Sequence, residues 1–322
     1  MDSGLSLIES GSLRDGVKAL QRLESEAAGQ PGPLASYARA RLPSAPAGSI
    51  FTGAGDSYAA ALLGFYASRG RCIALDPYTL ASEPEAARGV EVFFISVSGR
   101  TSSNALALSR VRRVAKKTTV LTADDGGPLA RGADEVVRLP LRYAPRSPGI
   151  LSFSLSALAV LKVVGAAAPF DFPATLERAK ADSKSPSLAK GTTYFLGNSL
   201  AHAAALYAAA KVYEILGRRA HAEALEEFSH MELFSLGRSD TVNIFSSFDA
   251  DRMSGKLKRA LAAEGYASAA VPARGRSATE HFFHCVFVSQ LWCLAEARRA
   301  GIAAPRFLAE AGRLRVSDRM IY

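Results

Sequence analysis

Short apolar runs alternate with alanine-rich, helix-spaced stretches from about residue 49 onward. The runs predict strands near 49–53, 72–75, 91–97, 118–122 and 134–139, and the spacing between them predicts helices over 56–69, 103–116 and 149–165. Strands that alternate with helices favour a parallel sheet covered by helices on both faces. Residues 5–43 have helical spacing throughout, interrupted at Gln30-Pro31-Gly32-Pro33, so we expect an N-terminal pair of helices or a wrapping arm.

A second round of the same pattern begins at Thr192. The stretch 196–206, with Gly197-Asn198-Ser199, echoes the stretch 52–62, with Gly53-Ala54-Gly55, and each follows an apolar strand and precedes an alanine-rich helix. Between the two rounds, residues 166–190 carry three prolines among charged residues and are expected to include the crossover between domains. We interpret the echo as an internal duplication.

The clearest chemical signal is the turn Ser96-Val97-Ser98-Gly99-Arg100-Thr101, which joins a predicted strand to a predicted helix. Backbone N–H groups are free at a helix N-terminus, and hydroxyls beside them suit an anion. In a parallel sheet, the turn at Gly55 and Ser57 opens at the same edge, because both turns follow the carboxyl ends of their strands. Ligands of such sheets bind at that edge. The hydroxyls predict a phosphate site; the alternative is that they only cap their helices.

Composition narrows the class of protein. The chain has 322 residues, of which 48% are hydrophobic, and its N-terminus has no signal-peptide pattern. No apolar run approaches the roughly 18 residues that span a bilayer, so no membrane contact is expected. An odd number of cysteines, three, argues against a disulfide framework, and they lack metal-ligand spacing. We expect a soluble cytoplasmic protein.

The formal net charge of +9 raises the question of nucleic-acid binding. The basic residues are dispersed, and the densest group, Arg112-Arg113 with Lys116-Lys117, has the spacing of a solvated helix face. A positive field also attracts an anionic sugar phosphate. No nucleic-acid partner is predicted.

A Gly-x-Gly-x-Ser motif followed about forty residues later by Ser-x-Ser-Gly-x-Thr resembles the sugar isomerase (SIS) family of phosphosugar-binding domains. The resemblance extends over 48–322 as two SIS domains in tandem. It implies an α/β fold of two doubly wound domains, each with a parallel five-stranded sheet flanked by helices. The expected division is an N-terminal helical arm at 1–45, a phosphate-binding domain at 46–168, and a second domain with a C-terminal tail at 169–322.

The resemblance also implies site residues. Ser57, Ser96, Ser98 and Thr101 would bind the substrate phosphate, and further contacts are expected from Gly55, Gly99, Lys211 and Arg306. The turn departs from the family pattern at Arg100, where many members carry Glu or Asn. Arg100 either adds charge to the phosphate site or faces solvent.

Three residues are expected to carry the chemistry by resemblance. The Pro145-Arg146 element is similar to that of archaeal bifunctional phosphoglucose/phosphomannose isomerases, in which the arginine stabilises negative charge at the reacting carbons. Glu214 and His230 match the spacing of the family's base and ring-opening residue, and His230 is expected to act in a neighbouring subunit. A partly desolvated carboxylate suits proton transfer between C1 and C2.

Structural roles compete for these positions. Arg146 can pair with a surface carboxylate, Glu214 with Arg218 at i, i+4, and His230 can be an ordinary residue at a helix N-terminus. Of the other histidines, His202 contacts substrate or caps a helix, and His221 is a weaker ring-opening candidate. His281 and His284 lie beside phenylalanines, where core or interface packing is expected.

One family element is missing. Members end with a Pro-Arg element followed by a lysine that closes over the substrate, whereas this chain has Pro305-Arg306 and no lysine after Lys258. Arg306, Arg313 and Arg315 are the candidates to supply the charge.

The expected function is a metal-independent aldose–ketose isomerase, without cofactor, that converts glucose 6-phosphate or mannose 6-phosphate to fructose 6-phosphate through a cis-enediol. The resemblance implies a homodimer, because His230 would act across an interface. The alternatives are an isomerising glucosamine-6-phosphate deaminase, or another amino-sugar phosphate isomerase, and a non-catalytic phosphosugar sensor.

Overall fold

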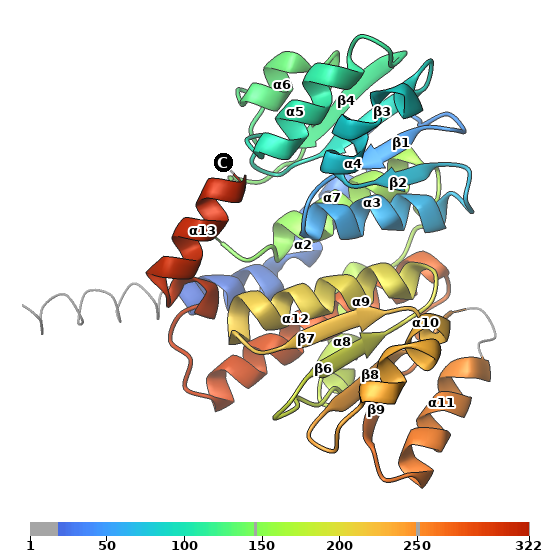
Figure 1. Cartoon of the computed structure of the whole chain (residues 1–322), viewed down its shortest axis with the longest axis vertical. Coiled ribbons are helices and arrows are strands. Elements are labelled where there is room, and N and C mark those ends of the chain that lie inside the picture. The colour runs from blue at the N-terminus through green and yellow to red at the C-terminus, as the bar shows by residue number, and fades with distance from the viewer. Residues whose placement is uncertain (1–18, 145–146, 249–251, 322) are drawn as a thin grey trace, which may run out of the picture.

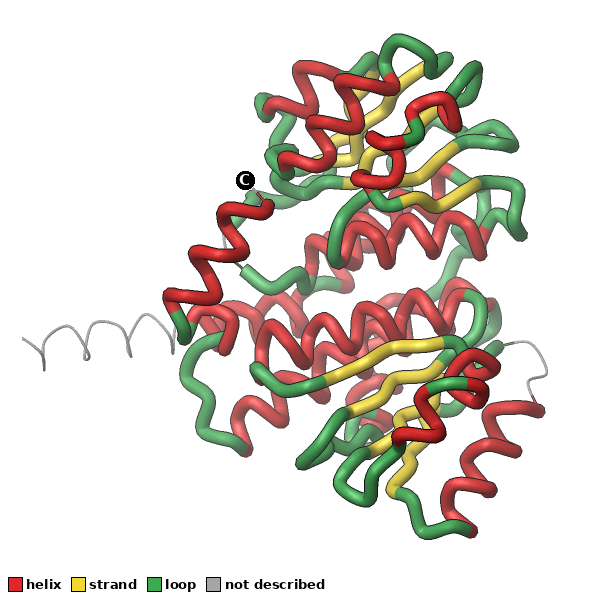
Figure 2. The backbone as a smooth tube through the Cα atoms, viewed as in Figure 1, coloured by secondary structure: helices red, strands yellow, loops and turns green. Residues whose placement is uncertain are grey.

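The computed structural model describes residues 19–144, 147–248 and 252–321. Its two halves each contain a parallel sheet, and helices fill the space between the sheets (Figures 1 and 2). The α/β class with parallel sheets flanked by helices is therefore confirmed. None of the helices within the described ranges combines the length and apolarity that a bilayer span requires.

The first sheet has five parallel strands in the order β2-β1-β3-β4-β5. Its central strand β3 is apolar on both faces, with Val92 and Phe94 in one cluster and Phe93 and Ile95 in another. Burial on both faces is why this strand is a continuous apolar run without alternation. The strands are β1 (Ile50–Thr52), β2 (Ile73–Leu75), β3 (Glu91–Ile95), β4 (Lys117–Thr122) and β5 (Glu135–Arg138).

Helices cover both faces of this sheet. The outer face packs against α4 (Pro77–Ser82), α5 (Ser102–Val111) and α6 (Pro128–Gly132), which join one apolar cluster with the turn η1 (Pro84–Ala87). The inner face packs against α3 (Asp56–Ala67) and α7 (Leu151–Val163). The short helices α4 and α6 were not predicted, since five or six residues are too few to show a helical period.

The second sheet has the order β7-β6-β8-β9, which repeats the order of the first four strands of the other sheet. The expectation of five strands is wrong here: the described residues form only four, β6 (Thr193–Leu196), β7 (Ala220–Glu223), β8 (Thr241–Phe245) and β9 (Ala267–Val271). After β9 the chain enters the long helix α12 (Ala278–Arg299), where the first half has α6 and β5. On the outer face lie α10 (Leu225–His230), the turn η3 (Glu232–Ser235) and α11 (Arg252–Ala263).

The duplication extends to backbone geometry. Gly55 before α3 has φ 60° and ψ −127°, and Ser199 before α9 (Leu200–Lys211) has φ 55° and ψ −130°. Positive φ is uncommon for a serine, so the shared conformation reflects a turn common to both halves.

The two halves share one apolar core, formed by α3 and α7 of the first against α9 and α12 of the second. The N-terminal arm, helical over 19–29 and in α2 (Pro31–Ala38), is fixed to both halves. Gln30 donates to Gln290 on α12 at 2.6 Å and accepts from Ser154 on α7 at 2.7 Å. The pair of helices expected for the arm is present where the structure describes it.

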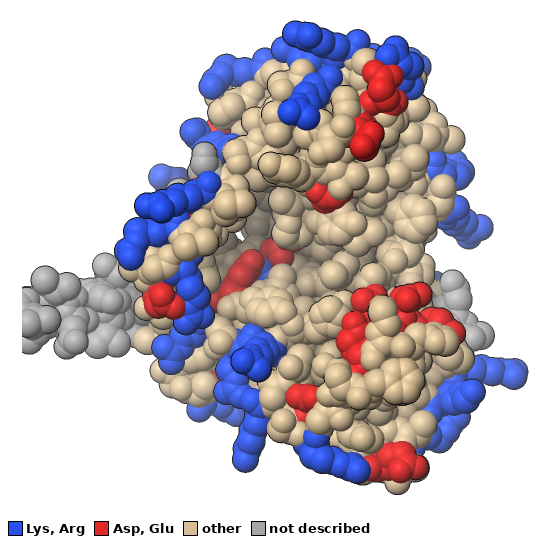
Figure 3. Space-filling view, viewed as in Figure 1, with Lys and Arg blue, Asp and Glu red and all other residues tan. Residues whose placement is uncertain are grey.

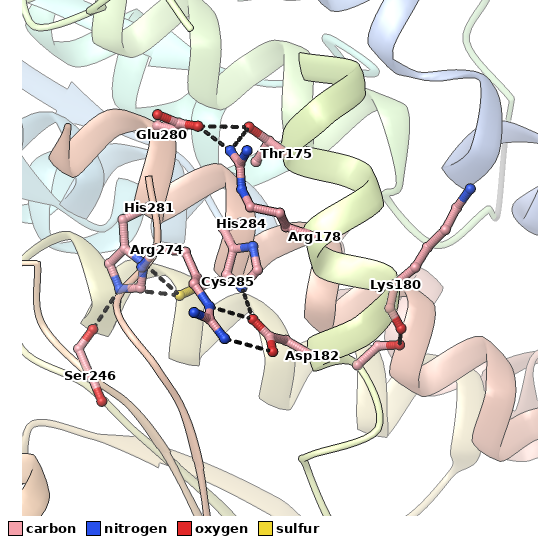
Figure 4. Close-up of polar contacts among 11 residues, drawn as sticks. Thr175, Arg178, Lys180, Asp182, Ser246, Arg274, Glu280, His281, His284 and Cys285 are labelled. Atoms are coloured by element: carbon pink, nitrogen blue, oxygen red, sulfur yellow. Dashed lines mark hydrogen bonds and ion pairs between the residues drawn. The ribbon is translucent and has the colours of Figure 1, made fainter. Parts of the chain in front are cut away.

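The aromatic stretch of α12 lies in the core: Phe282, Phe283, Phe287 and Trp292 are fully buried. Beside it, α8 (Phe172–Asp182) carries a polar network with α12 (Figure 4). His284 Nε2 lies 3.0 Å from Asp182 Oδ2, and Arg274 binds the same carboxylate. His281 Nε2 donates to the Ser246 carbonyl oxygen at 2.5 Å, and its Nδ1 accepts from the backbone N–H of Arg274 at 3.2 Å. Both histidines are therefore core residues.

Candidate functional site

The two predicted turns meet because β1 and β3 are neighbours in the first sheet. Gly53 makes the close approach possible: a Cβ there would lie 2.6 Å from the Cβ of Ser57 and 2.9 Å from the carbonyl oxygen of Ile95. Any side chain at 53 would separate α3 from the end of β3. The sequence therefore brings the Ser57 turn and the Ser96 turn together through one glycine.

The hydroxyls on these turns do not serve as helix caps. Thr101 is the N-cap residue of α5, yet its side chain makes no capping hydrogen bond, and α3 is capped by Gly55, which has no side chain. Ser96 and Ser98 are nearly buried, and the Ser98 hydroxyl accepts a bond from the N–H of Arg100 at 3.3 Å. The hydroxyls thus lie beside the N-termini of α3 and α5, an arrangement that can stabilise an anion.

A cavity of about 450 Å³ opens on these turns, and its walls come from both halves, the arm and the tail. Figure 3 shows the surface hollowed between the two halves beside the C-terminal helix α13 (Ala311–Ile321). The volume of the cavity suits a small phosphorylated ligand. The predicted residues that line it are Gly55, Ser57, Ser96, Ser98, Thr101 and Glu214.

Glu214 reaches the cavity from a π-helical turn, η2 (Val212–Leu216), that follows α9 and ends at Gly217 with φ 63°. Such turns widen a helix locally and are frequent at functional sites. The carboxylate accepts a hydrogen bond from the ammonium of Lys211, three residues earlier. Lys211 also donates to Asp56 Oδ2 at 2.8 Å, and Arg218 donates instead to the carbonyl oxygens of Ala189 and Lys190. The alternative pairing of Glu214 with Arg218 is therefore wrong.

The environment changes the acidity of these groups. Burial raises the pKa of Glu214 to about 7, against the opposing effect of the Lys211 ammonium. Burial alone would lower the pKa of Lys211, but the carboxylates of Asp56 and Glu214 raise it above its ordinary value. Glu214 is thus a carboxylate that can both take and return a proton near neutral pH.

Other predicted residues lie elsewhere. His230 is at the C-terminal end of α10 with 72% of its side chain exposed, 3.1 Å from Glu226, and it is outside the residues that line the cavity of this chain. Gly99 lies within the Ser96–Thr101 turn with φ 62°, outside the lining residues. Lys211 contacts Glu214, and none of its side chain is exposed. Arg306, at the start of η4 (Arg306–Leu308), packs against Gly217. Arg146 lies outside the described residues.

The remaining candidates have defined partners. His202 is half-buried with Nδ1 2.9 Å from the Tyr66 hydroxyl, so it contacts the other half rather than capping its helix. Arg100 pairs with Asp124 at 2.9 Å, away from the cavity. His221 Nε2 lies 3.1 Å from Glu232 Oε1, and with Glu223 these groups lie within 4.8 Å of one another, a geometry that can hold a divalent cation. That cluster is separate from the cavity.

The tail covers the cavity without a lysine. Leu314, Ser317 and Asp318 of α13 line it, and the Ser102 hydroxyl bonds to the Met320 carbonyl oxygen at 3.4 Å. Within the described part of the chain, Arg306, Arg313 and Arg315 are not among the lining residues, so the expectation that one of them replaces the lysine is not met. Of the cationic residues in the described ranges, Arg22 of the arm and Arg142 line the cavity.

Several lining residues were not predicted. Asp56 stands inside the motif that was recognised, but its partner Lys211 is 155 positions away, and only the packing of α3 against α9 reveals the pair. Tyr143 and the serines of the loop before α7 and of α7 itself carry no local motif. The lining residues in this group are Asp56, Tyr143, Ser147, Ser152 and Ser156.

Comparison with known proteins finds matches among solved structures only; neither a protein-family model nor a curated sequence matches the chain. A glucosamine-6-phosphate deaminase from Thermotoga maritima superposes with a TM-score of 0.73 at 19% identity, over 87% of this chain and 95% of that one. A tagatose-6-phosphate ketose/aldose isomerase from Escherichia coli gives 0.63 at 17% identity, over 91% and 93%.

The C-terminal domain of glucosamine-fructose-6-phosphate aminotransferase from Francisella tularensis gives a TM-score of 0.59 at 15% identity, over 86% and 96% of the two chains. At identities this low, the superpositions establish a common fold and nothing further. The chain therefore has the two-sheet α/β fold of phosphosugar isomerase and deaminase structures, along nearly their whole length.

Proposed function

We propose that this protein is an aldose–ketose isomerase of hexose 6-phosphates that interconverts glucose 6-phosphate or mannose 6-phosphate with fructose 6-phosphate. One observation carries the proposal: Glu214, with a pKa raised to about 7, lines the same cavity as the hydroxyl-rich turns at two helix N-termini. An anion site and a neutral-range base in one cavity are what the isomerisation of a phosphorylated sugar requires.

The phosphate would bind between the N-termini of α3 and α5. Free N–H groups and the positive end of each helix dipole favour a dianion there, and the hydroxyls donate further hydrogen bonds. Anchoring the phosphate fixes the distance from it to C1 and C2, so that the same base meets both carbons. The proposed ligands are Ser57, Ser96, Ser98 and Thr101.

Glu214 would transfer the proton. In the direction from aldose to ketose, its carboxylate removes the proton from C2, and the electron pair moves through the new C1–C2 double bond onto the C1 oxygen. The C2 hydroxyl proton passes to the C1 oxygen, and the carboxylic acid then returns its proton to C1 as the C2 oxygen becomes the ketone oxygen. Arg146 is the proposed partner of the negative charge that develops on the oxygens, because a guanidinium stays protonated. The tail and the arm cover the cavity and restrict water around the intermediate.

The ring must open first, and we assign this step to His230 of a second subunit. Its exposure supports the assignment, because an exposed side chain is free to enter a neighbouring cavity. Met231 and Phe234 beside it are 52% and 84% exposed, and large apolar residues that protrude together are typical of an interface. The proposed assembly is a homodimer.

A second candidate has specific support. Asp56 and Glu214 bring two carboxylates to the cavity with one buried ammonium between them, which favours a cationic group on the ligand. The amino group of glucosamine 6-phosphate is such a group, and the deaminase from Thermotoga maritima has a similar fold. An isomerising deamination would release ammonia.

The deciding experiment is incubation of the full chain with fructose 6-phosphate in D₂O, followed by identification of all products by NMR. Isomerase activity gives glucose or mannose 6-phosphate with deuterium at C2. Added ammonia that yields glucosamine 6-phosphate, with no reaction in its absence, selects the deaminase. Glu214→Gln should lower the rate by about 10²–10⁴-fold while fructose 6-phosphate still binds; near-normal turnover by this variant refutes the assignment of the base.

A further inference from the structure

The Lys211 ammonium is shared between two carboxylates that come from different halves of the protein. Its Nζ lies 2.8 Å from Asp56 Oδ2 and also contacts Glu214 Oε2, and its side chain is fully buried. Asp56 is in the first turn of α3, whereas Lys211 and Glu214 lie on α9 and the turn after it. The three groups meet only where the halves pack together.

Asp56 is held firmly in this position. A Cβ on residue 149 would lie 2.5 Å from Asp56 Oδ2, so the glycine at 149 leaves the space that the carboxylate occupies. The carbonyl oxygen of Gly149 accepts a hydrogen bond from the Tyr207 hydroxyl at 2.6 Å, which fixes this backbone segment. The second oxygen, Asp56 Oδ1, is buried and has no hydrogen-bond partner among the described residues. The chain thus keeps a carboxylate here at a cost in desolvation.

We propose that Asp56 is a positioning residue for the proton transfer: by binding one side of the Lys211 ammonium, it prevents Lys211 from neutralising Glu214 alone. This role rests on the proposed function of Glu214 as the base. With a single carboxylate, Lys211 would form a one-to-one ion pair and hold Glu214 permanently ionised. With two, the cluster carries a net negative charge when both are ionised, and Glu214, which lines the ligand cavity together with Asp56, can accept a proton.

The other groups around Glu214 bear on its titration. Tyr207 of α9 lies with its ring centroid 5.0 Å from the Lys211 ammonium, and Cys293 of α12 interacts electrostatically with Lys211 and Glu214. Burial raises the pKa of both above the neutral range, so neither changes charge between pH 5 and 9. Besides Asp56 and Glu214, the charged or titratable residues on the described cavity wall are Arg22, Glu26, Arg142, Tyr143 and Asp318.

The test compares Asp56→Asn with wild type by ¹³C NMR titration of the Glu214 carboxyl carbon, assigned with Glu214→Gln, in the full chain. Wild-type Glu214 should titrate near pH 7, and in Asp56→Asn the midpoint should fall by about one pH unit or more, since a like charge is removed. The acidic limb of kcat/KM should move by the same amount. The matched control is Glu24→Gln, which removes a carboxylate paired with Arg298 outside the cavity and should leave the midpoint unchanged.

An unchanged Glu214 midpoint in folded Asp56→Asn overturns the proposal. If Asp56→Asn does not fold, Gly149→Ala takes its place, because it displaces the Asp56 carboxylate and keeps every charge. The Glu214 midpoint should also fall in Gly149→Ala, and an unchanged Glu214 midpoint in that variant overturns the proposal as well. Absence of turnover with any sugar phosphate would refute the proposed function but leave the NMR comparison decisive for Asp56. The two failures are therefore distinguishable.

Discussion

The Tyr207 hydroxyl donates a 2.6 Å hydrogen bond to the carbonyl oxygen of Gly149 and so joins α9 of the second half to the start of α7 in the first. Gln290 of α12 donates to the same hydroxyl at 3.0 Å. The ring is fully buried, so both bonds lie away from water. This hydroxyl is a polar link between the two halves, and the Tyr207 ring centroid lies 5.0 Å from the Lys211 ammonium that binds Asp56.

Tyr207→Phe should therefore lower stability. The variant keeps the ring but removes the donor to the Gly149 carbonyl in a buried place, at a cost of about 1–3 kcal/mol. Gln290 loses one acceptor and keeps the Ile150 carbonyl oxygen and the Ser154 hydroxyl. Chemical denaturation monitored by circular dichroism measures the loss. Tyr213→Phe, whose hydroxyl bonds within the second half and whose side chain is half exposed, is the comparison and should cost less.

The hydroxyls of the two turns should contribute to anion affinity one by one. Ser57→Ala and Thr101→Val each remove one donor to a charged group, and each should weaken fructose 6-phosphate binding about 10-fold or more. Isothermal titration calorimetry gives the affinities. The control is Ser109→Ala on α5, whose hydroxyl bonds to the Leu106 carbonyl oxygen at the surface. Equal affinities in Ser57→Ala, Thr101→Val and Ser109→Ala would show that the phosphate does not bind to these turns.

His284 should make the protein less stable in acid. Burial lowers the pKa of His284 to about 4, below its ordinary value of about 6.5, despite the Asp182 carboxylate 3.0 Å away. Because the folded pKa is the lower one, the free energy of unfolding is undiminished above pH 6.5. It then falls toward pH 4 by as much as about 1.4 kcal/mol per pH unit.

Urea denaturation at pH 7.5, 6.0 and 5.0 measures this dependence. His284→Gln removes the titrating group and should flatten the curve over that window, even if its stability at pH 7.5 is lower. If the free energy of unfolding of His284→Gln falls with pH as steeply as that of the wild type, groups other than His284 cause the loss of stability in acid.

A site shared between subunits predicts complementation. Glu214→Gln and His230→Ala should each be nearly inactive alone. After mixing and subunit exchange, half of the dimers are heterodimers, and each has one intact site of two, so activity should return to about a quarter of wild type. No recovery after verified exchange would mean that Glu214 and His230 do not act together across an interface.

Removal of divalent cations should not change turnover, because the proposed proton transfer uses Glu214 directly. Dialysis against EDTA followed by a rate measurement checks this. A loss that added metal restores would instead draw attention to the cluster of His221, Glu223 and Glu232, and His221→Ala would then show whether that cluster is responsible.

Local patterns were sufficient for much of the fold. The order of strands and helices in the first half follows from short apolar runs and helical spacing, and the strand–turn–helix joint predicted at Ser96 is present and lines the cavity. These features depend on neighbours within a few residues, so the chain displays them directly. The second sheet shows the limit of such prediction: five strands were expected, and the described residues form four.

By itself, the sequence determined the alternation of strands and helices, the hydroxyls on the two turns, and the candidacy of Glu214. Only the tertiary structure decided that Glu214 shares a cavity with those hydroxyls, that Asp56 competes for the Lys211 ammonium, and that His230 lies outside the cavity of its own chain. The physical reason is the packing of α3 against α9, which brings side chains 155 positions apart to within 2.8 Å and buries their charges together. The desolvation and shared ammonium that follow are properties of that interface.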